Sequence, residues 1–102
     1  MISRHWKGIS RRDRADAYVR HLEAETLPAL RAIPGFVQAS ILRRDVATGT
    51  EFQVVTVWQS LEAIRAFAGE DAEVAVVPPI ARDMMVAFDA RASHYEVVYP
   101  HS

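Results

Sequence analysis

The most regular pattern of apolar and polar positions lies between residues 15 and 33. Apolar side chains recur there at intervals of three and four, which predicts one amphipathic helix of about 20 residues. Ser10 carries the hydroxyl of a helix cap and is predicted to start this helix, while Pro34 ends it. Pro28 lies inside the pattern and removes one backbone hydrogen bond, so we expect a kink or break near residues 25–27.

Segments with alternating or β-branched residues predict four strands. They span residues 2–9, 36–46, 51–59 and 93–99. The turn composition of residues 47–50 indicates that the second and third strands form an antiparallel hairpin. Ser60 is expected to cap a second helix, which ends at Gly69.

Residues 70–92 have the weakest pattern. They predict a helical turn before Pro78, followed by either a short helix or an edge strand around residues 84–88. The element order is therefore β-α-β-β-α-β, which is typical of a ferredoxin-like α+β fold: a four-stranded antiparallel sheet with helices on one face. The chain has 102 residues and no internal repeat or linker, so we expect a single domain over residues 1–102.

The third strand is apolar on both of its sides. Phe52, Val54 and Trp58 share one side, and Val55 and Val57 share the other. Helices cover only one face of the predicted sheet, so the second apolar face needs another cover. We therefore predict a homodimer that packs sheet to sheet.

Composition and charge exclude several classes of function. The net charge of −1 lacks the basic excess of a general nucleic-acid binder. The absence of cysteine excludes disulfides, thiol nucleophiles, iron–sulfur clusters and cysteine-bound zinc. No segment approaches the roughly 18 apolar residues of a membrane span, and the first residues lack the apolar core of a signal peptide. We expect a cytoplasmic protein without nucleic-acid or membrane partners.

The chain has four histidines, whose side chains can bind metal ions or transfer protons near neutral pH. No two of them have the spacing of metal ligands with a carboxylate alongside, so no metal site is predicted. His21 and Glu25 lie one helical turn apart and are interpreted as a surface pair. His94 begins a strand that is otherwise suited to burial, and it is either a structural hydrogen-bonded residue or a catalytic acid, base or ligand anchor.

Aromatic side chains occur on several of the predicted elements. Trp58 ends the third strand, at the junction of sheet and helices where pockets form in such folds. Tyr18 and Phe67 project from the apolar faces of the two helices, and Trp6 lies in the first strand. These residues are either simply core or, together with Thr56, the walls of a pocket for a flat organic molecule.

Short motifs are spread along nearly the whole chain. They are Met-Ile-x-Arg-x-Trp-x-Gly at 1–8, Ala-Asp-Ala-Tyr at 15–18, Pro-Gly at 34–35, Trp-x-Ser-x-x-Ala at 58–63 and His-Tyr-Glu-Val-Val at 94–98. Together they resemble the antibiotic biosynthesis monooxygenase superfamily of dimeric α/β barrels. The resemblance implies a ferredoxin-like protomer, a homodimeric barrel and a pocket between sheet and helices. It also implies either oxidation of aromatic polyketides or quinols by O2, without metal or flavin, or breakdown of haem.

The chain departs from the residues that this resemblance implies for catalysis. The pocket asparagine of the polyketide-oxidising members falls on Val54, and their tyrosine falls on Ile64. The haem-degrading members use an asparagine on the first strand, a tryptophan on the second helix and a histidine shortly after it. Here the first strand has no asparagine, Phe67 stands near the tryptophan position, and residues 68–80 contain no histidine.

Three functions follow from these observations. The first is a cofactor-independent monooxygenase-like protein that binds or oxidises a small aromatic or apolar molecule, with His94 as the base. The second is a non-catalytic small-molecule-binding or stress-related dimeric module, which the aliphatic residues at the family's polar positions favour. The third is haem binding or degradation, ranked last because the family's iron ligand is missing.

Overall fold

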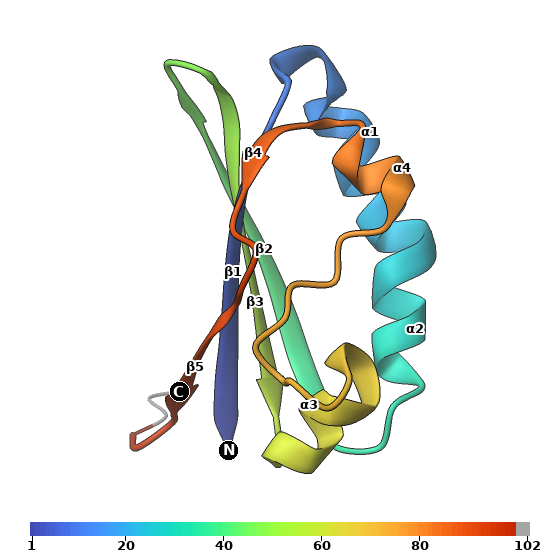
Figure 1. The fold of residues 1–102 in the computed structure, drawn as a ribbon, viewed down its shortest axis with the longest axis vertical. Coiled ribbons are helices and arrows are strands. Elements are labelled where there is room, and N and C mark those ends of the chain that lie inside the picture. The colour runs from blue at the N-terminus through green and yellow to red at the C-terminus, as the bar shows by residue number, and fades with distance from the viewer. Residues whose placement is uncertain (100–102) are drawn as a thin grey trace.

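The computed structural model describes residues 1–99 and has two layers, a sheet and a set of helices against one of its faces (Figure 1). In chain order the elements are β1 (Ile2–Ser10), a 3-10 turn (Arg12–Arg14), α1 (Ala15–His21), a π-turn (Leu22–Thr26), α2 (Leu27–Arg31), β2 (Phe36–Val46), β3 (Gly49–Trp58), α3 (Leu61–Ala68), α4 (Pro79–Arg82), β4 (Met85–Phe88) and β5 (Ser93–Glu96). This is the predicted α+β, ferredoxin-like arrangement.

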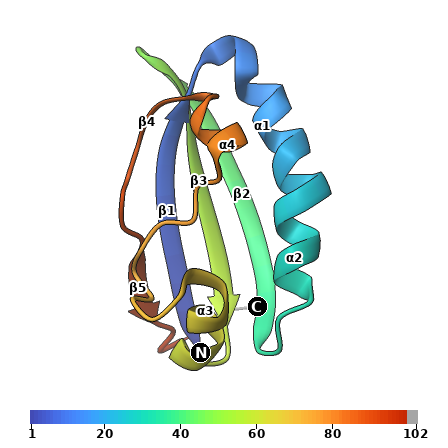
Figure 2. The same cartoon turned by 45° about the vertical axis from the view of Figure 1, so that its right-hand side comes forward.

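The sheet is antiparallel and has the order β2-β3-β1-β4, with β5 also paired to β1. β4 pairs with residues 8–10 of β1, and β5 pairs with residues 2–5. Figure 2 shows the two short strands end to end along one edge of the sheet. The predicted fourth strand is therefore divided: the strand expected at residues 93–99 ends at Glu96, and the ambiguous segment around residues 84–88 supplies the other part.

The long helix is interrupted where Pro28 was expected to disturb it. The interruption is the π-turn, which ends just before α2, and Pro28 is the second residue of α2. Because a π-turn takes more residues per turn, side chains spaced by four can stay on the sheet-facing side. Those side chains are Tyr18, Leu22, Thr26 and Leu30. No helix within residues 1–99 is long and apolar enough to cross a membrane.

The two predicted helix starts have different outcomes. The cap at Ser60 is confirmed, since its Oγ accepts a hydrogen bond from the backbone N–H of Ala63 at 3.2 Å. Gly69 ends α3 with a φ of 97°, as predicted. The cap at Ser10 is wrong: Ser10 belongs to β1, is fully buried, and its hydroxyl donates to the carbonyl of Arg11 at 3.0 Å.

The register of β3 determines what lies between the two layers. Its helix-facing positions are Phe52, Val54, Thr56 and Trp58, a sequence of large, small, small and large side chains. Phe52 lies in a cluster with Tyr18, and their ring centroids are 4.9 Å apart at 70°. Trp58 lies in a second cluster at the other end of the strand. The small residues leave space between the two clusters.

The opposite face of the sheet carries no helix (Figure 1). The predicted alternation of β3 is confirmed, because Val55 and Val57 point to this outer face. Leu42 of β2 and Tyr95 of β5 share the face and are 54% and 58% exposed. The single chain therefore presents an apolar strip on its uncovered side.

Candidate functional site

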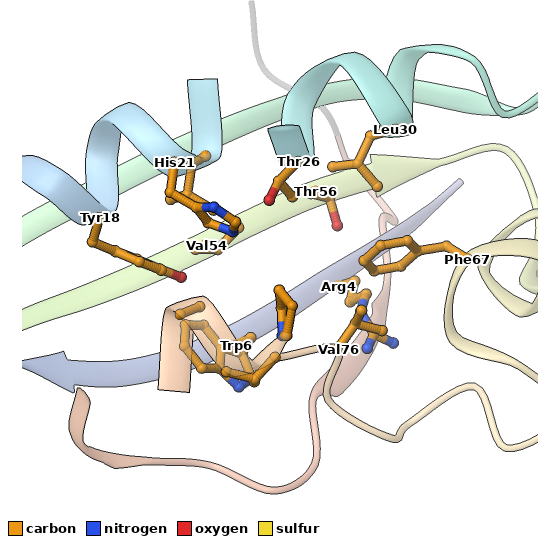
Figure 3. A pocket seen from close by; sticks show the side chains of 14 residues that line it. Arg4, Trp6, Tyr18, His21, Thr26, Leu30, Val54, Thr56, Phe67 and Val76 are labelled. Atoms are coloured by element: carbon orange, nitrogen blue, oxygen red, sulfur yellow. The ribbon is translucent and has the colours of Figure 1, made fainter. Parts of the chain in front are cut away.

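A cavity lies between the sheet and the helices where β3 carries Val54 and Thr56 (Figure 3). Its open interior is narrow, about 60 Å³, whereas about 400 Å³ is open in the adjoining hollow at the surface. The two hollows share His21, Thr26 and Phe67, so the second is the mouth of the first. The interior is therefore small, and its lining is mostly apolar.

Three aromatic side chains from three different elements form the cavity walls: Trp6 from β1, Tyr18 from α1 and Phe67 from α3. Trp6 is held by its Nε1–H, which donates to the carbonyl of Asp89 at 2.8 Å. Its ring also lies over Gly8, where a Cβ atom would approach the indole to 2.5 Å. Glycine at this position therefore lets the indole lie close to the strand.

The charged and titratable groups of the cavity lining lie at its two ends, with Thr26 and Thr56 between them (Figure 3). Figure 3 shows Tyr18 and His21 on one side, and Arg4 and Phe67 on the other. Burial raises the pKa of the Tyr18 hydroxyl, so this group stays protonated and can donate a hydrogen bond. The Nε2 atom of His21 is buried and has no hydrogen-bond partner among residues 1–99.

Arg4 is a buried cation that joins β1 to the segment forming one cavity wall. Its Nη2 donates to the carbonyl of Val74 at 2.8 Å, and its Nη1 donates to the carbonyl of Ala72. The guanidinium carbon lies 5.7 Å from the centre of the Phe67 ring, a cation–π contact. Burial lowers the pKa of Arg4, and the negative charge of Glu73 partly opposes this shift. The Arg4 guanidinium remains charged and is the one arginine or lysine on the described cavity lining.

The structure brings together four of the six residues that the sequence suggested for the site. Trp6, Tyr18, Thr56 and Phe67 all line the cavity. Trp58 does not line it, because this side chain is fully buried in the neighbouring cluster. The Nε1–H of Trp58 donates to Thr56 Oγ1 at 2.8 Å. Trp58 therefore holds the side chain of Thr56, which does line the cavity.

His94 also lies outside the cavity lining, on the far side of Arg4. Its Nε2 atom is 2.9 Å from Arg4 Nη1. Because arginine is always the donor, the histidine nitrogen accepts and the ring is neutral in this arrangement. Burial, and secondly the charge of Arg4, lower the pKa of His94. The side chain expected to be the base is therefore placed to orient Arg4.

Sequence reasoning missed Arg4, His21 and Thr26 as cavity residues. The signals for two of them were available: Arg4 shares a strand face with Trp6, and His21 lies three residues after Tyr18 on one helix face. Of the two positions where the family resemblance implied polar groups, Val54 lines the cavity, whereas Ile64 is fully buried beside Trp58.

Within residues 1–99, no three histidine, aspartate or glutamate side chains gather closely enough to hold a metal ion. Three groups on the cavity lining can exchange or hold a proton or a charge: Arg4, Tyr18 and His21. The arrangement can bind an aromatic ring between apolar walls and place polar groups of the ligand at either end.

Comparison with solved structures shows the same fold. A protein from Bacillus cereus assigned to the antibiotic biosynthesis monooxygenases has 19% identity and a TM-score of 0.69, over 100% of this chain and 95% of that one. A haem-degrading protein from Mycobacterium tuberculosis has 25% identity and a TM-score of 0.62, over 100% and 97%. A Streptomyces coelicolor monooxygenase in complex with nanaomycin D has 16% identity and a TM-score of 0.56, over 98% and 91%.

A comparison with curated proteins finds no match. The sequence model of the antibiotic biosynthesis monooxygenase family, in contrast, matches residues 10–77, more than half of the chain. This region runs from the end of β1 through the helices and strands that bear most of the cavity. The chain therefore belongs to the antibiotic biosynthesis monooxygenase family.

Proposed function

We propose that this protein binds a small, flat aromatic molecule in the cavity and oxidises it with O2, without metal or flavin. The observation that carries the proposal is the narrow space walled by Trp6, Tyr18 and Phe67. Aromatic walls favour a flat aromatic ligand, and a concave apolar site with few polar groups is the usual form of a small-molecule site. The Streptomyces coelicolor monooxygenase, which was solved with nanaomycin D, has the same fold.

In such a reaction the substrate supplies the electrons. An activated CH2 group of the substrate, as in an anthrone, loses a proton to a basic group on the cavity lining, and the resulting carbanion reduces O2. One oxygen atom remains in the product as a carbonyl and the other leaves as water with the two hydrogens, so that CH2 and O2 give C=O and H2O. A hydroquinone instead gives two electrons and two protons to O2, so that a quinone and H2O2 form. The apolar walls exclude water, and the Arg4 guanidinium stabilises the anion that develops. His94, predicted as the base, acts here as a positioning residue for Arg4, which it contacts at 2.9 Å.

Oxygen consumption tests this proposal. An oxygen electrode measures turnover with a panel of anthrones and hydroquinones, using the wild type, Val54→Phe and Val98→Phe. Val54→Phe fills the cavity, whereas Val98 is 82% exposed outside it and serves as the control. We expect turnover by the wild type and Val98→Phe and its loss in Val54→Phe. If no panel member consumes O2, the proposed oxidation is wrong. If none stabilises the protein against heat either, the proposed binding is wrong as well.

Binding without turnover is the second candidate function. Val54, an aliphatic residue, stands on the cavity lining where the resemblance implied a hydrogen-bonding residue, and this favours a binding module. Such a module would show an increase in Tm with ligand but no oxygen consumption, because a ligand that binds only the folded state stabilises it.

Haem binding is favoured by one observation, the unpartnered Nε2 of His21, and the haem-degrading relative has the same fold. The open interior of about 60 Å³ is too narrow for a porphyrin unless the α1–α2 helix moves away from the sheet. A Soret band that shifts on titration with the wild type and not with His21→Ala would establish this function. An unshifted band excludes it.

We also propose that two copies pack through the outer face of the sheet. Val55 and Val57 lie at the centre of this face, with Leu42 and Tyr95 beside them. Sedimentation equilibrium tests the proposal with Val55→Asp and a matched control, Val76→Asp, at the cavity mouth. An unpaired charge in a buried interface costs about 3 kcal/mol or more, so Val55→Asp should weaken dimerisation at least about a hundredfold. A wild type that is monomeric at micromolar concentration would overturn the proposal.

A further inference from the structure

His21 is the one described residue whose buried polar side-chain atom has no hydrogen-bond partner. It ends α1 and contributes to both the interior and the mouth of the cavity. Its ring is nearly parallel to that of Tyr18, with a centroid distance of 6.5 Å and an angle of 24°. The stacked contact involves the ring face and leaves Nε2 at the ring edge unpaired (Figure 3).

An unpaired buried nitrogen is costly to the free protein. Nearly all buried polar groups in folded proteins are hydrogen-bonded, and leaving one without a partner destabilises the fold. A residue that lines a cavity can regain the lost interaction when a ligand fills that cavity. His21 therefore has the property expected of a group that is reserved for a ligand.

The chemistry of the lining restricts what this ligand carries. When the proton of a neutral imidazole is on Nδ1, Nε2 is an acceptor and requires a donor from the ligand. The walls beside it are the aromatic rings of Tyr18 and Trp6, so the donor is attached to a flat ring. A hydroxyl on an aromatic ring meets both requirements.

We propose that His21 Nε2 receives the hydroxyl proton of a phenolic ligand, which leaves a phenolate in the cavity and an imidazolium on α1. The proposal rests on the proposed function and supplies the base that it lacks. A phenol fits both steps, because the enol form of an anthrone is a phenol and gives the same anion as the loss of the CH2 proton. The O–H bond of the ligand breaks, an N–H bond forms at Nε2, and no electron leaves the pair. The charged and titratable groups facing His21 are the Tyr18 hydroxyl on α1, Arg4 across the cavity and Glu25 at the mouth. Arg4 favours the phenolate because the two charges are opposite.

A chromophoric phenol tests the proton transfer directly. 4-Nitrophenol is titrated into the wild type, His21→Phe and the control Val98→Phe at a pH where the free phenol is mostly neutral, and the visible phenolate band is recorded. Nitrobenzene, which lacks the hydroxyl, is titrated in parallel. His21→Phe keeps a flat ring beside Tyr18 and removes the nitrogen.

We expect the wild type and Val98→Phe to increase the phenolate band and to bind 4-nitrophenol about tenfold more tightly than His21→Phe does. Nitrobenzene should bind all three proteins alike. Equal phenolate bands in wild type and His21→Phe overturn the role of His21, while nitrobenzene binding still supports the aromatic site. Failure of both probes to bind counts against the proposed function as well.

A second measurement does not depend on the variant folding. In the wild type, the NMR signal of the His21 ring carbon between the two nitrogens should shift on addition of 4-nitrophenol toward the position of an imidazolium. Nitrobenzene should leave it at the position of a neutral ring. Identical spectra with the two probes would contradict the proposal.

Discussion

The two ends of β3 face the same helices but meet them in different ways. At Trp58 the space is closed: the indole is fully buried and lies edge-to-face against Phe36, with ring centroids 5.3 Å apart at 76°. Two to four residues earlier, Val54 and Thr56 leave the cavity open. β3 is therefore closely packed against the helices where its inward side chains are large and leaves a cavity where they are small.

This difference explains why Trp58 does not line the cavity despite its position between sheet and helices. A large aromatic side chain fills the space that it enters, and the surrounding rings of Phe36 and Phe67 complete the closure. The cavity begins where the side chains become small. A close-packed end next to an open centre also fixes the cavity walls, because interiors at full packing density resist deformation.

The largest expected change in stability is at the closely packed end of β3, around Trp58. Trp58→Ala should lower the free energy of unfolding by about 3–5 kcal/mol, since it empties a fully buried aromatic position. The matched variant Val54→Ala borders space that is already open and should cost only about 1–2 kcal/mol. Urea unfolding followed by circular dichroism measures both. Equal losses would show that the two ends of the strand are packed alike.

A smaller change in stability is expected at Thr56, which lies between the closely packed end of β3 and the cavity. Thr56→Val removes the oxygen that accepts from Trp58 Nε1–H and leaves that buried donor unsatisfied, at a cost of about 1–3 kcal/mol. Thr26→Val makes the same change on the helix side of the cavity and should alter the stability by less than about 0.5 kcal/mol. Urea midpoints that fall equally in the two variants would argue against a structural role for the Thr56 hydroxyl.

The smallest expected change is in how stability depends on pH, through His94. The pKa of His94 is lowered in the folded protein by burial and by Arg4, so below the ordinary histidine value of 6.5 the unfolded state binds more protons. The contribution of His94 to stability is therefore complete above that pH and is lost as the pH falls through the folded pKa. His94→Gln should give a shallower decline in Tm between pH 7 and pH 5 than the wild type, because the glutamine amide accepts from Arg4 without titrating. Parallel curves would contradict the assigned contact.

Much of the fold follows from periodicity, because local patterns report which face of an element is buried. The long helix, the β2–β3 hairpin and the capped α3 were all predictable in this way. Residues 70–92 were not, since tertiary contacts rather than local pattern hold them: Arg4 binds the carbonyl of Val74, and Val74 in turn pairs with Arg91. Because Arg4 belongs to β1, its contact with residues 70–92 produces no repeating pattern of apolar and polar residues within that segment.

The site was predictable in part for the same reason. Helix periods place Tyr18 and Phe67 on inward faces, but the sequence leaves open which side of each strand faces the helices, and so whether Trp6 or its neighbour His5 faces the pocket. The periods also do not say where along a face the packing closes or opens. The sequence also does not show that His94 lies beside Arg4 in the sheet register, or that Arg4 lies between His94 and the cavity. Whether an inward side chain is packed in the core or lines a cavity depends on the volumes of the side chains around it, and these come from segments that are distant in the sequence.

The π-turn at Leu22–Thr26 holds one residue more than an ordinary α-helical turn would at the same place. Without the π-turn, Tyr18 and Leu30, which are twelve residues apart, would differ by about 120° in direction on a uniform α-helix. Deleting a single residue there, such as Ala24, would restore the i, i+4, i+7, i+11 spacing of a regular amphipathic helix and keep Tyr18, Leu22, Thr26 and Leu30 on one face. In evolutionary terms, the turn has the form of a one-codon insertion that reshapes the helix beside the cavity and leaves the packing at both of its ends in register.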